Sequence, residues 1–146
     1  MDLREAGPGD LGALLELYAQ FRGEEVPAES DGLNALWMRI LDCPDRHIIL
    51  AGENGRVISS CTLIIVPNLT HGQRPYALIE NVITHENFRK KGYATAVLNY
   101  ARDIAMSSRC YKIMLMTGAK DDGTLRFYER AGYNQKDKTA FIQWLD

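Results

Sequence analysis

The spacing of apolar residues changes several times along the chain and divides it into predicted elements. Alternation over residues 3–6 indicates a short edge strand, and the turn after it ends at Asp10, which we expect to cap the next helix with its carboxylate. Helical spacing predicts a first helix on Leu11, Leu14, Leu15 and Tyr18. A second helix should begin at Ser30-Asp31 and end before Pro44, with one apolar side made of Leu33, Leu36, Trp37, Ile40 and Leu41.

The apolar period shortens after His47, which predicts a sheet in the middle of the chain. Two β-rich runs, 47–53 and 56–66, meet at Asn54-Gly55, a dipeptide typical of a two-residue hairpin. Residues 67–75 contain Pro, Asn, Gly and Thr and indicate a loop, and residues 76–84 form a third β-rich run. These segments predict an antiparallel meander.

The last third of the chain alternates helix and strand. A helix is predicted from Ala94, Val97, Leu98, Ala101 and Ala105, which share one face. Residues 111–117 should form a buried strand parallel to the strand before that helix. A short helix should follow from Asp122 to Ala131-Gly132, and then a last strand or hairpin within 133–145. The pattern predicts one domain over residues 1–146, of the α+β class in three layers, with a mixed sheet flanked by helices.

Composition narrows the function classes. Apolar residues make up 46% of the chain and charged residues 25%, as in an ordinary globular protein, and a net charge of −2 does not favour general nucleic-acid binding. No apolar run approaches the length of a membrane span, and the acidic N-terminal stretch is unlike a secretory signal. We therefore expect a cytoplasmic protein that binds neither nucleic acid nor membranes.

Cysteine and histidine spacing argues against disulfides and metals. The cysteines are odd in number and widely separated, and we expect structural roles for Cys43, Cys61 and Cys110. The histidines show no ligand spacing to one another or to the cysteines, so no metal site is expected at His47, His71 or His85.

The segment 79–101 carries the candidate chemistry. A strand ends near Thr84, and the run Arg89-Lys90-Lys91-Gly92-Tyr93-Ala94 leads into the apolar helix. Unpaired backbone N–H groups and the helix dipole make such a junction suited to an anion, and Gly92 lets a ligand approach the backbone closely. One interpretation is therefore a pyrophosphate cradle. The other is a basic loop whose glycine serves only the turn.

Two spaced motifs resemble the GNAT superfamily of N-acetyltransferases. Arg89, Gly92 and Ala94 fill the family's acetyl-CoA signature Arg/Gln-x-x-Gly-x-Gly/Ala, and residues 125–133 are similar to its Phe/Leu-Tyr-x-Lys/Arg-x-Gly-Phe/Tyr element. The resemblance covers about residues 48 to 135. It implies a GNAT fold with splayed central strands and transfer of acetyl from acetyl-CoA to an amine.

The resemblance also implies roles for individual residues. The backbone of Val82, Ile83 and Thr84 would pair with the pantetheine arm, and the N–H of Val82 or Ile83 would hold the oxyanion. Tyr128 would protonate the departing thiolate. Backbone N–H groups would bind the pyrophosphate from Arg89, Lys90, Lys91, Gly92, Tyr93, Ala94 and Thr95.

The chain departs from the family in the approach to Tyr128. Asp121 stands where many relatives carry an asparagine that contacts the cofactor, and Thr124 stands where Ala or Ser is usual. Asp121 would bring a negative charge towards a polyanionic molecule, so we do not assign it cofactor binding.

The acceptor amine must lose a proton, and Glu80 is the candidate base because it lies on the strand just before the pantetheine contacts. A solvated or salt-bridged strand carboxylate is the alternative interpretation of Glu80, and a packing aromatic that of Tyr128. Glu86 is expected to be solvated, and His85 and His71 are weaker candidates for the base.

The acceptor is left open, although a small molecule is favoured over a protein. Its specificity should come from segments 21–31 and 67–75, the first of which holds several carboxylates. Residues 110–113 and 127–129 resemble glucosamine-phosphate acetyltransferases, but they would serve the core and the cofactor. A non-catalytic acetyl-CoA sensor is the alternative function, and a homodimer stays open.

Overall fold

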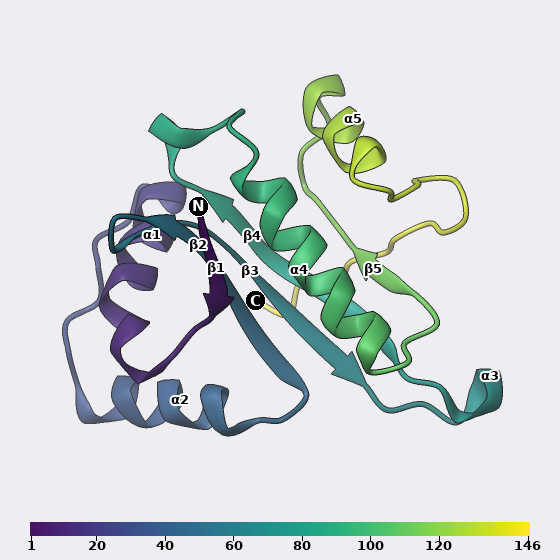
Figure 1. Cartoon of the computed structure of the whole chain (residues 1–146), viewed down its shortest axis with the longest axis horizontal. Coiled ribbons are helices and arrows are strands. Elements are labelled where there is room, and N and C mark those ends of the chain that lie inside the picture. Colours follow the sequence, from purple (N-terminus) through teal and green to yellow (C-terminus); the bar gives the residue numbers. More distant parts are fainter. The chain divides into compact units, whose positions relative to one another are not determined.

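Five strands in the order β1-β2-β3-β4-β5 form a mixed sheet in the computed structural model, which describes residues 1–146 (Figure 1). The strands are β1 (Asp2–Glu5), β2 (Arg46–Glu53), β3 (Arg56–Val66), β4 (Tyr76–Thr84) and β5 (Ile113–Leu115). The first four pair antiparallel. Beside β4, the Tyr111 amide donates to the Pro75 carbonyl and the Ala77 amide to the Lys112 carbonyl, so this last pairing runs parallel, as predicted.

The helices fall between the strands in the predicted order. They are α1 (Leu11–Arg22), α2 (Asp31–Asp42), α3 (Thr70–Gln73), α4 (Tyr93–Ser107) and α5 (Asp122–Arg130), with 3-10 turns η1 (Pro8–Asp10) and η2 (Glu86–Phe88). The chain groups into two compact units, Met1–Met114 and Leu115–Asp146. No helix is both long and apolar enough to cross a membrane.

The β2–β3 hairpin turns at Asn54 and Gly55, whose φ angles are 51° and 76°. Positive φ at both central residues is the geometry of a type I′ turn, which suits the twist of paired strands. The predicted hairpin is therefore confirmed.

Both faces of the sheet in the first unit are covered by helices. On one face, α1 and α2 pack on Ile48 and Leu50 through Leu14 and Trp37. Residues alternate between faces along a strand, so the buried Ile49 and Ala51 face the other way, where α4 packs on β2 and β3 (Figure 1). The predicted α+β class, with helices flanking a mixed sheet, is confirmed.

Cys61 lies on the α4 face as a buried thiol, and its Sγ is 3.6 Å from the Val97 carbonyl that it contacts as a weak donor. Burial raises the pKa of this thiol to about 12. A protonated, inaccessible sulfur is unreactive, which agrees with the structural role expected for Cys61.

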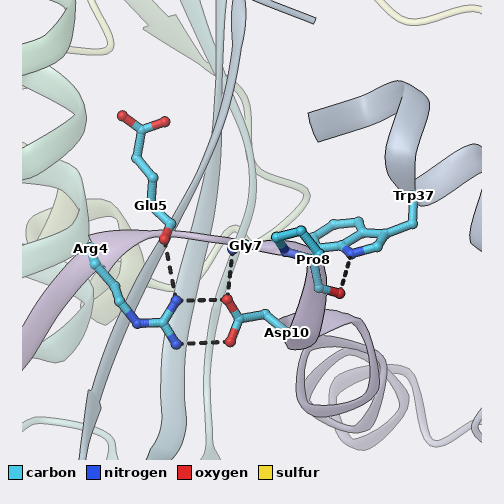
Figure 2. A network of polar contacts seen from close by, with 6 residues as sticks. All are labelled: Arg4, Glu5, Gly7, Pro8, Asp10 and Trp37. Carbon is cyan, nitrogen blue, oxygen red and sulfur yellow. Dashed lines mark hydrogen bonds and ion pairs between the residues drawn. The ribbon is translucent and has the colours of Figure 1, made fainter. Parts of the chain in front are cut away.

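A polar network ties β1 to the start of α1 (Figure 2). The Arg4 guanidinium donates to both carboxylate oxygens of Asp10, at 2.6 and 2.8 Å, and the Gly7 amide donates to the same carboxylate at 2.7 Å. Trp37 of α2 donates its indole N–H to the Pro8 carbonyl at 3.1 Å. Together these bonds hold α1 and α2 at one end of the sheet.

Three expectations for local structure were wrong. Asp10 occupies the N-cap position of α1 but accepts no hydrogen bond from that helix, because Arg4 and Gly7 take its carboxylate. The loop 67–75 contains the short turn α3, in which His71 and Gly72 have left-handed backbone angles. Residues 133–146 form no strand and expose Phe141, Ile142, Trp144 and Leu145, because an extended segment becomes a strand only beside another backbone.

Candidate active site

A bulge in β4 is the central feature of the candidate site. Ser60 faces Ile83 and Thr62 faces Glu80, so Cys61 stands opposite two residues, Asn81 and Val82. Asn81 absorbs the extra length with φ 53°, a left-handed angle that Asn tolerates better than most residues.

The bulge decides which amides of β4 face its neighbour β3. The His85 amide donates to the Ile58 carbonyl at 2.8 Å, and Ile83, two residues before His85 on β4, is paired with Ser60, two residues after Ile58 on β3. Alternation along an antiparallel strand therefore directs the Ile83 amide into the β3 ladder and the amides of Val82 and Thr84 towards the opposite edge of β4. Of the two amides expected to hold an oxyanion, only that of Val82 points away from β3.

Buried side chains fix this end of β4. The Ser59 hydroxyl donates to the Ile83 carbonyl at 3.0 Å and lies 2.7 Å from the Thr84 hydroxyl. Ser59 is fully buried, so these bonds are shielded from water and keep the strand in one register.

The N-cap of α4 is Gly92, which lies eight residues after the end of β4 and has a φ angle of 87°. The first intrahelical bond runs from the Ala96 amide to the Gly92 carbonyl, so the amides of Tyr93, Ala94 and Thr95 precede the bonded ladder. A Cβ added at Gly92 would meet no atom within 4 Å. The glycine is therefore needed for its backbone angle, and the space before the helix is accessible to a ligand.

Three cations precede this helix without a carboxylate partner. Arg89, Lys90 and Lys91 are exposed, and none of them forms an ion pair. The Lys91 ammonium lies 4.9 Å from the centre of the Phe88 ring, which in turn packs edge-on against the buried Tyr93. With the helix dipole, this end of α4 forms a positive region suited to a phosphate group.

Glu80 lies immediately before the bulge and is exposed, and its side chain forms neither a hydrogen bond nor an ion pair. Its side chain lines a pocket of about 340 Å³ between α1, α2 and the sheet. The helices contribute mainly leucines, Ile40 and Trp37 to this pocket. The strands add Ile48, Ile64, Thr62, Asn81 and Arg46 beside Glu80.

Tyr18 brings a hydroxyl to the same pocket from α1. Burial raises the pKa of this phenol, and the nearby hydroxyls of Thr62 and Ser60 offset part of that rise. Ser60 Oγ is buried and has no hydrogen-bond partner within bonding distance. The pocket lining therefore includes two hydroxyl-bearing residues, Tyr18 and Thr62.

The candidate acid Tyr128 belongs to the second unit and lies on α5. Asp121 caps α5 by accepting the Thr124 amide at 2.9 Å, and that bond lowers the pKa of its carboxyl. The Tyr128 ring packs against Phe127, with centroids 5.0 Å apart, and edge-on against Tyr133 at 6.3 Å. The role of Asp121 that the structure shows is thus that of a helix cap.

The two histidines considered as bases are both engaged in other contacts. His71 stacks on Tyr111, with ring centroids 3.9 Å apart, and His85 lies 2.8 Å from the Arg56 guanidinium. Nδ1 of His85 also accepts the Asn87 amide. The chain contains no group of three or more His, Cys, Asp or Glu that could hold a metal ion.

Two features of the site were not predicted from the sequence: the bulge at Asn81 and the pocket hydroxyls of Tyr18 and Thr62. The polar residues Ser59, Ser60 and Thr62 inside an apolar strand were the available signal, because buried hydroxyls commonly serve a specific contact.

Comparisons with known proteins agree on one family. The sequence profile described as "Acetyltransferase (GNAT) family" matches residues 11–133. Glucosamine 6-phosphate N-acetyltransferase of Trypanosoma brucei brucei is 32% identical over 138 residues, which cover 94% of this chain and 92% of that protein.

Solved structures show the same fold. A protein of Agrobacterium tumefaciens strain C58, assigned as an acetyltransferase, superposes with a TM-score of 0.91 at 41% identity and covers 99% of this chain and 100% of its own. Glucosamine-6-phosphate N-acetyltransferase from Arabidopsis thaliana is 20% identical with a TM-score of 0.84, and the match covers 99% of this chain and 98% of that one. With its two motifs, its mixed sheet and these relatives, the chain belongs to the GNAT family of acetyltransferases.

Proposed function

We propose that this protein transfers the acetyl group of acetyl-CoA directly to the amine of a small molecule, with Glu80 as the base. The observation that carries the proposal is the position of Glu80. Its unpaired carboxylate lines the pocket of about 340 Å³, and the same strand turns the amides of Val82 and Thr84 away from β3. One strand thus presents a proton acceptor and backbone donors side by side.

The residues before α4 fit the cosubstrate that the family uses. The free amides of Tyr93, Ala94 and Thr95, together with the unpaired cations at Arg89, Lys90 and Lys91, match a pyrophosphate in charge and in donor type. The amides of Val82 and Thr84 would pair with the pantetheine arm as an added strand would. When bound, acetyl-CoA supplies an activated thioester.

The proposed steps use groups of this chain. Glu80 accepts a proton from the acceptor's ammonium, directly or through water, because only the neutral amine is a nucleophile. The Val82 amide stabilises the negative charge that develops on the attacked carbonyl oxygen. Tyr128 donates a proton to the departing thiolate. This role rests on the resemblance of residues 125–133 to the family's tyrosine element.

The first test combines turnover with the pH dependence of one variant. Wild-type protein should release free thiol from acetyl-CoA only when an amine is present, which a non-catalytic sensor would not do. Glu80→Gln should lower kcat at pH 7 by about 10²-fold, and activity should recover as the pH approaches the amine's pKa of about 10. Recovery is expected because the acceptor then arrives neutral.

Glu86→Gln is the matched control for this variant. Glu86 is an exposed carboxylate of η2 that does not line the pocket, and its replacement should leave the pH profile unchanged. Wild-type activity of Glu80→Gln at pH 7 would remove Glu80 from the mechanism. Thiol release that no amine stimulates would contradict the proposed acetyl transfer to amines.

A further inference from the structure

The pocket that Glu80 lines is divided in chemical character. Towards the helices its wall is mostly apolar and includes Leu14, Leu36 and Trp37. Towards the sheet, beside two isoleucines, it carries Glu80 and Thr62, which face each other across β3 and β4. A pocket with one polar side and one apolar side selects a molecule with the same division.

We propose that the acceptor is an amphipathic primary amine, with its ammonium at Glu80 and a small alkyl or aryl group against α1 and α2. This inference rests on the proposed function, because it names the substrate class of the same site. The unpaired Glu80 carboxylate complements an ammonium ion, and the hydroxyls of Tyr18 and Thr62 can accept its remaining N–H donors.

The size of the pocket limits the acceptor. A volume of about 340 Å³ lies at the lower end of the roughly 300–1,000 Å³ typical of ligand sites, so a large polycyclic or oligosaccharide amine would not be enclosed. The apolar group should therefore be about the size of a phenyl ring or a short alkyl chain.

A sugar phosphate fits this pocket less well. Those of its hydroxyls that lie against the helices would meet leucines and Trp37, whose indole N–H already donates to the Pro8 carbonyl, and unpaired buried polar groups are costly. A phosphate would find one cation in the lining, Arg46, whereas bound phosphates commonly have several donors. The expected acceptor therefore differs from the sugar phosphate in the name of the trypanosomal relative.

The experiment compares kcat/KM for four acceptors: 2-phenylethylamine, hexylamine, methylamine and glucosamine 6-phosphate. Hexylamine should exceed methylamine at least tenfold, because each methylene buried against the helices adds a factor of about four. 2-Phenylethylamine should exceed glucosamine 6-phosphate by at least tenfold, because the sugar leaves polar groups unpaired.

Two variants of α2 locate the effect. Leu36 lines the pocket and is 43% exposed, whereas Met38 is 42% exposed and does not line it. Both side chains therefore tolerate a polar replacement with similar cost to the fold. Leu36→Gln should reduce kcat/KM for hexylamine about tenfold and leave that for methylamine nearly unchanged, whereas Met38→Gln should alter neither.

The outcomes separate the two proposals. Preference for glucosamine 6-phosphate, or equal loss in the Leu36→Gln and Met38→Gln proteins, would overturn the amphipathic acceptor while acetyl transfer to amines stands. Absence of transfer to all four amines, with no stimulated thiol release, would overturn the proposed function and this inference with it.

Discussion

Asn81 changes the direction of the backbone at the point where β4 passes the pocket. Its left-handed angle, φ 53°, adds one residue opposite Cys61 and resets the alternation of the strand. Without that extra residue, the first amide after Glu80 to point away from β3 would belong to a residue other than Val82. A single residue, Asn81, thus separates the candidate base Glu80 from the Val82 amide and sets the direction of that amide.

Tyr128 is the second residue on which the proposed mechanism depends. A thiol comparable to free cysteine has a pKa of about 8.5, so the thiolate leaves moderately well even without a proton, and the benefit of an acid is limited. Tyr128→Phe keeps the ring packing and removes only the hydroxyl. Steady-state kinetics should show kcat lowered by about 10²-fold, with the KM for acetyl-CoA changed no more than a few-fold.

Tyr133→Phe is the control for that variant, because Tyr133 packs edge-on against Tyr128 and the family motif accepts either ring at this position. It should retain wild-type kcat. An unchanged kcat in the Tyr128→Phe protein would make Tyr128 a packing residue. A rise in KM alone would make it a binding residue for acetyl-CoA.

At the scale of elements, the ion pair between β1 and the start of α1 holds one wall of the pocket. Arg4 lowers the pKa of the Asp10 carboxyl through two hydrogen bonds, and the Gly7 amide adds to this effect. A lowered pKa means that the carboxylate stabilises the fold above the ordinary aspartate pKa of about 3.9 and loses this effect as the pH falls through the folded value.

Asp10→Asn should therefore lower the free energy of unfolding by about 1 kcal/mol at pH 7. Urea denaturation should show the same difference from wild type at pH 5. The difference should shrink as the pH falls below about 3.9, where the carboxyl of the unfolded chain takes up a proton. Asp103→Asn is the control, since its contact with Arg102 is 3.3 Å long and solvent-exposed. A pH-independent difference for Asp10→Asn would show that the charge of Asp10 does not act in this way.

Elements determined by local sequence were predicted well. The bounds of β3 and β4 agree with the predicted runs, Asn54 and Gly55 form the expected turn, and Ser30 caps α2 by accepting the Leu33 amide. Hydrophobic period, turn residues and caps act over a few positions, so one stretch of sequence contains the whole cause.

Features that depend on distant partners could not be predicted. The Asp10 carboxylate could either cap α1 or pair with a cation, and the position of Arg4 in the folded chain favours the ion pair. The bulge at Asn81 depends on the register of two strands, which becomes visible only in the sheet. The candidate site followed the same rule: Gly92 and Glu80 came from local motifs, whereas Tyr18 and Thr62 reach the pocket from other elements.

At the scale of the whole molecule, the proposed binding region for acetyl-CoA consists of one sheet and one helix N-terminus. A ligand that binds only the folded state at a hundred times its Kd stabilises that state by about 2.7 kcal/mol. For a chain of this length, such a gain should raise the melting temperature by several degrees. The shift tests binding without any knowledge of the acceptor.

The most direct measurement compares this shift in wild-type protein and two glutamate variants. Gly92→Glu places a negative charge before α4, whereas Gly55→Glu places one at the β2–β3 turn, where φ is also positive and no atom lies within 4 Å of the added Cβ. Both variants carry similar backbone strain. We predict that acetyl-CoA raises the melting temperature of wild-type and Gly55→Glu proteins and leaves that of Gly92→Glu unchanged. A folded Gly92→Glu protein with the full shift would contradict the account.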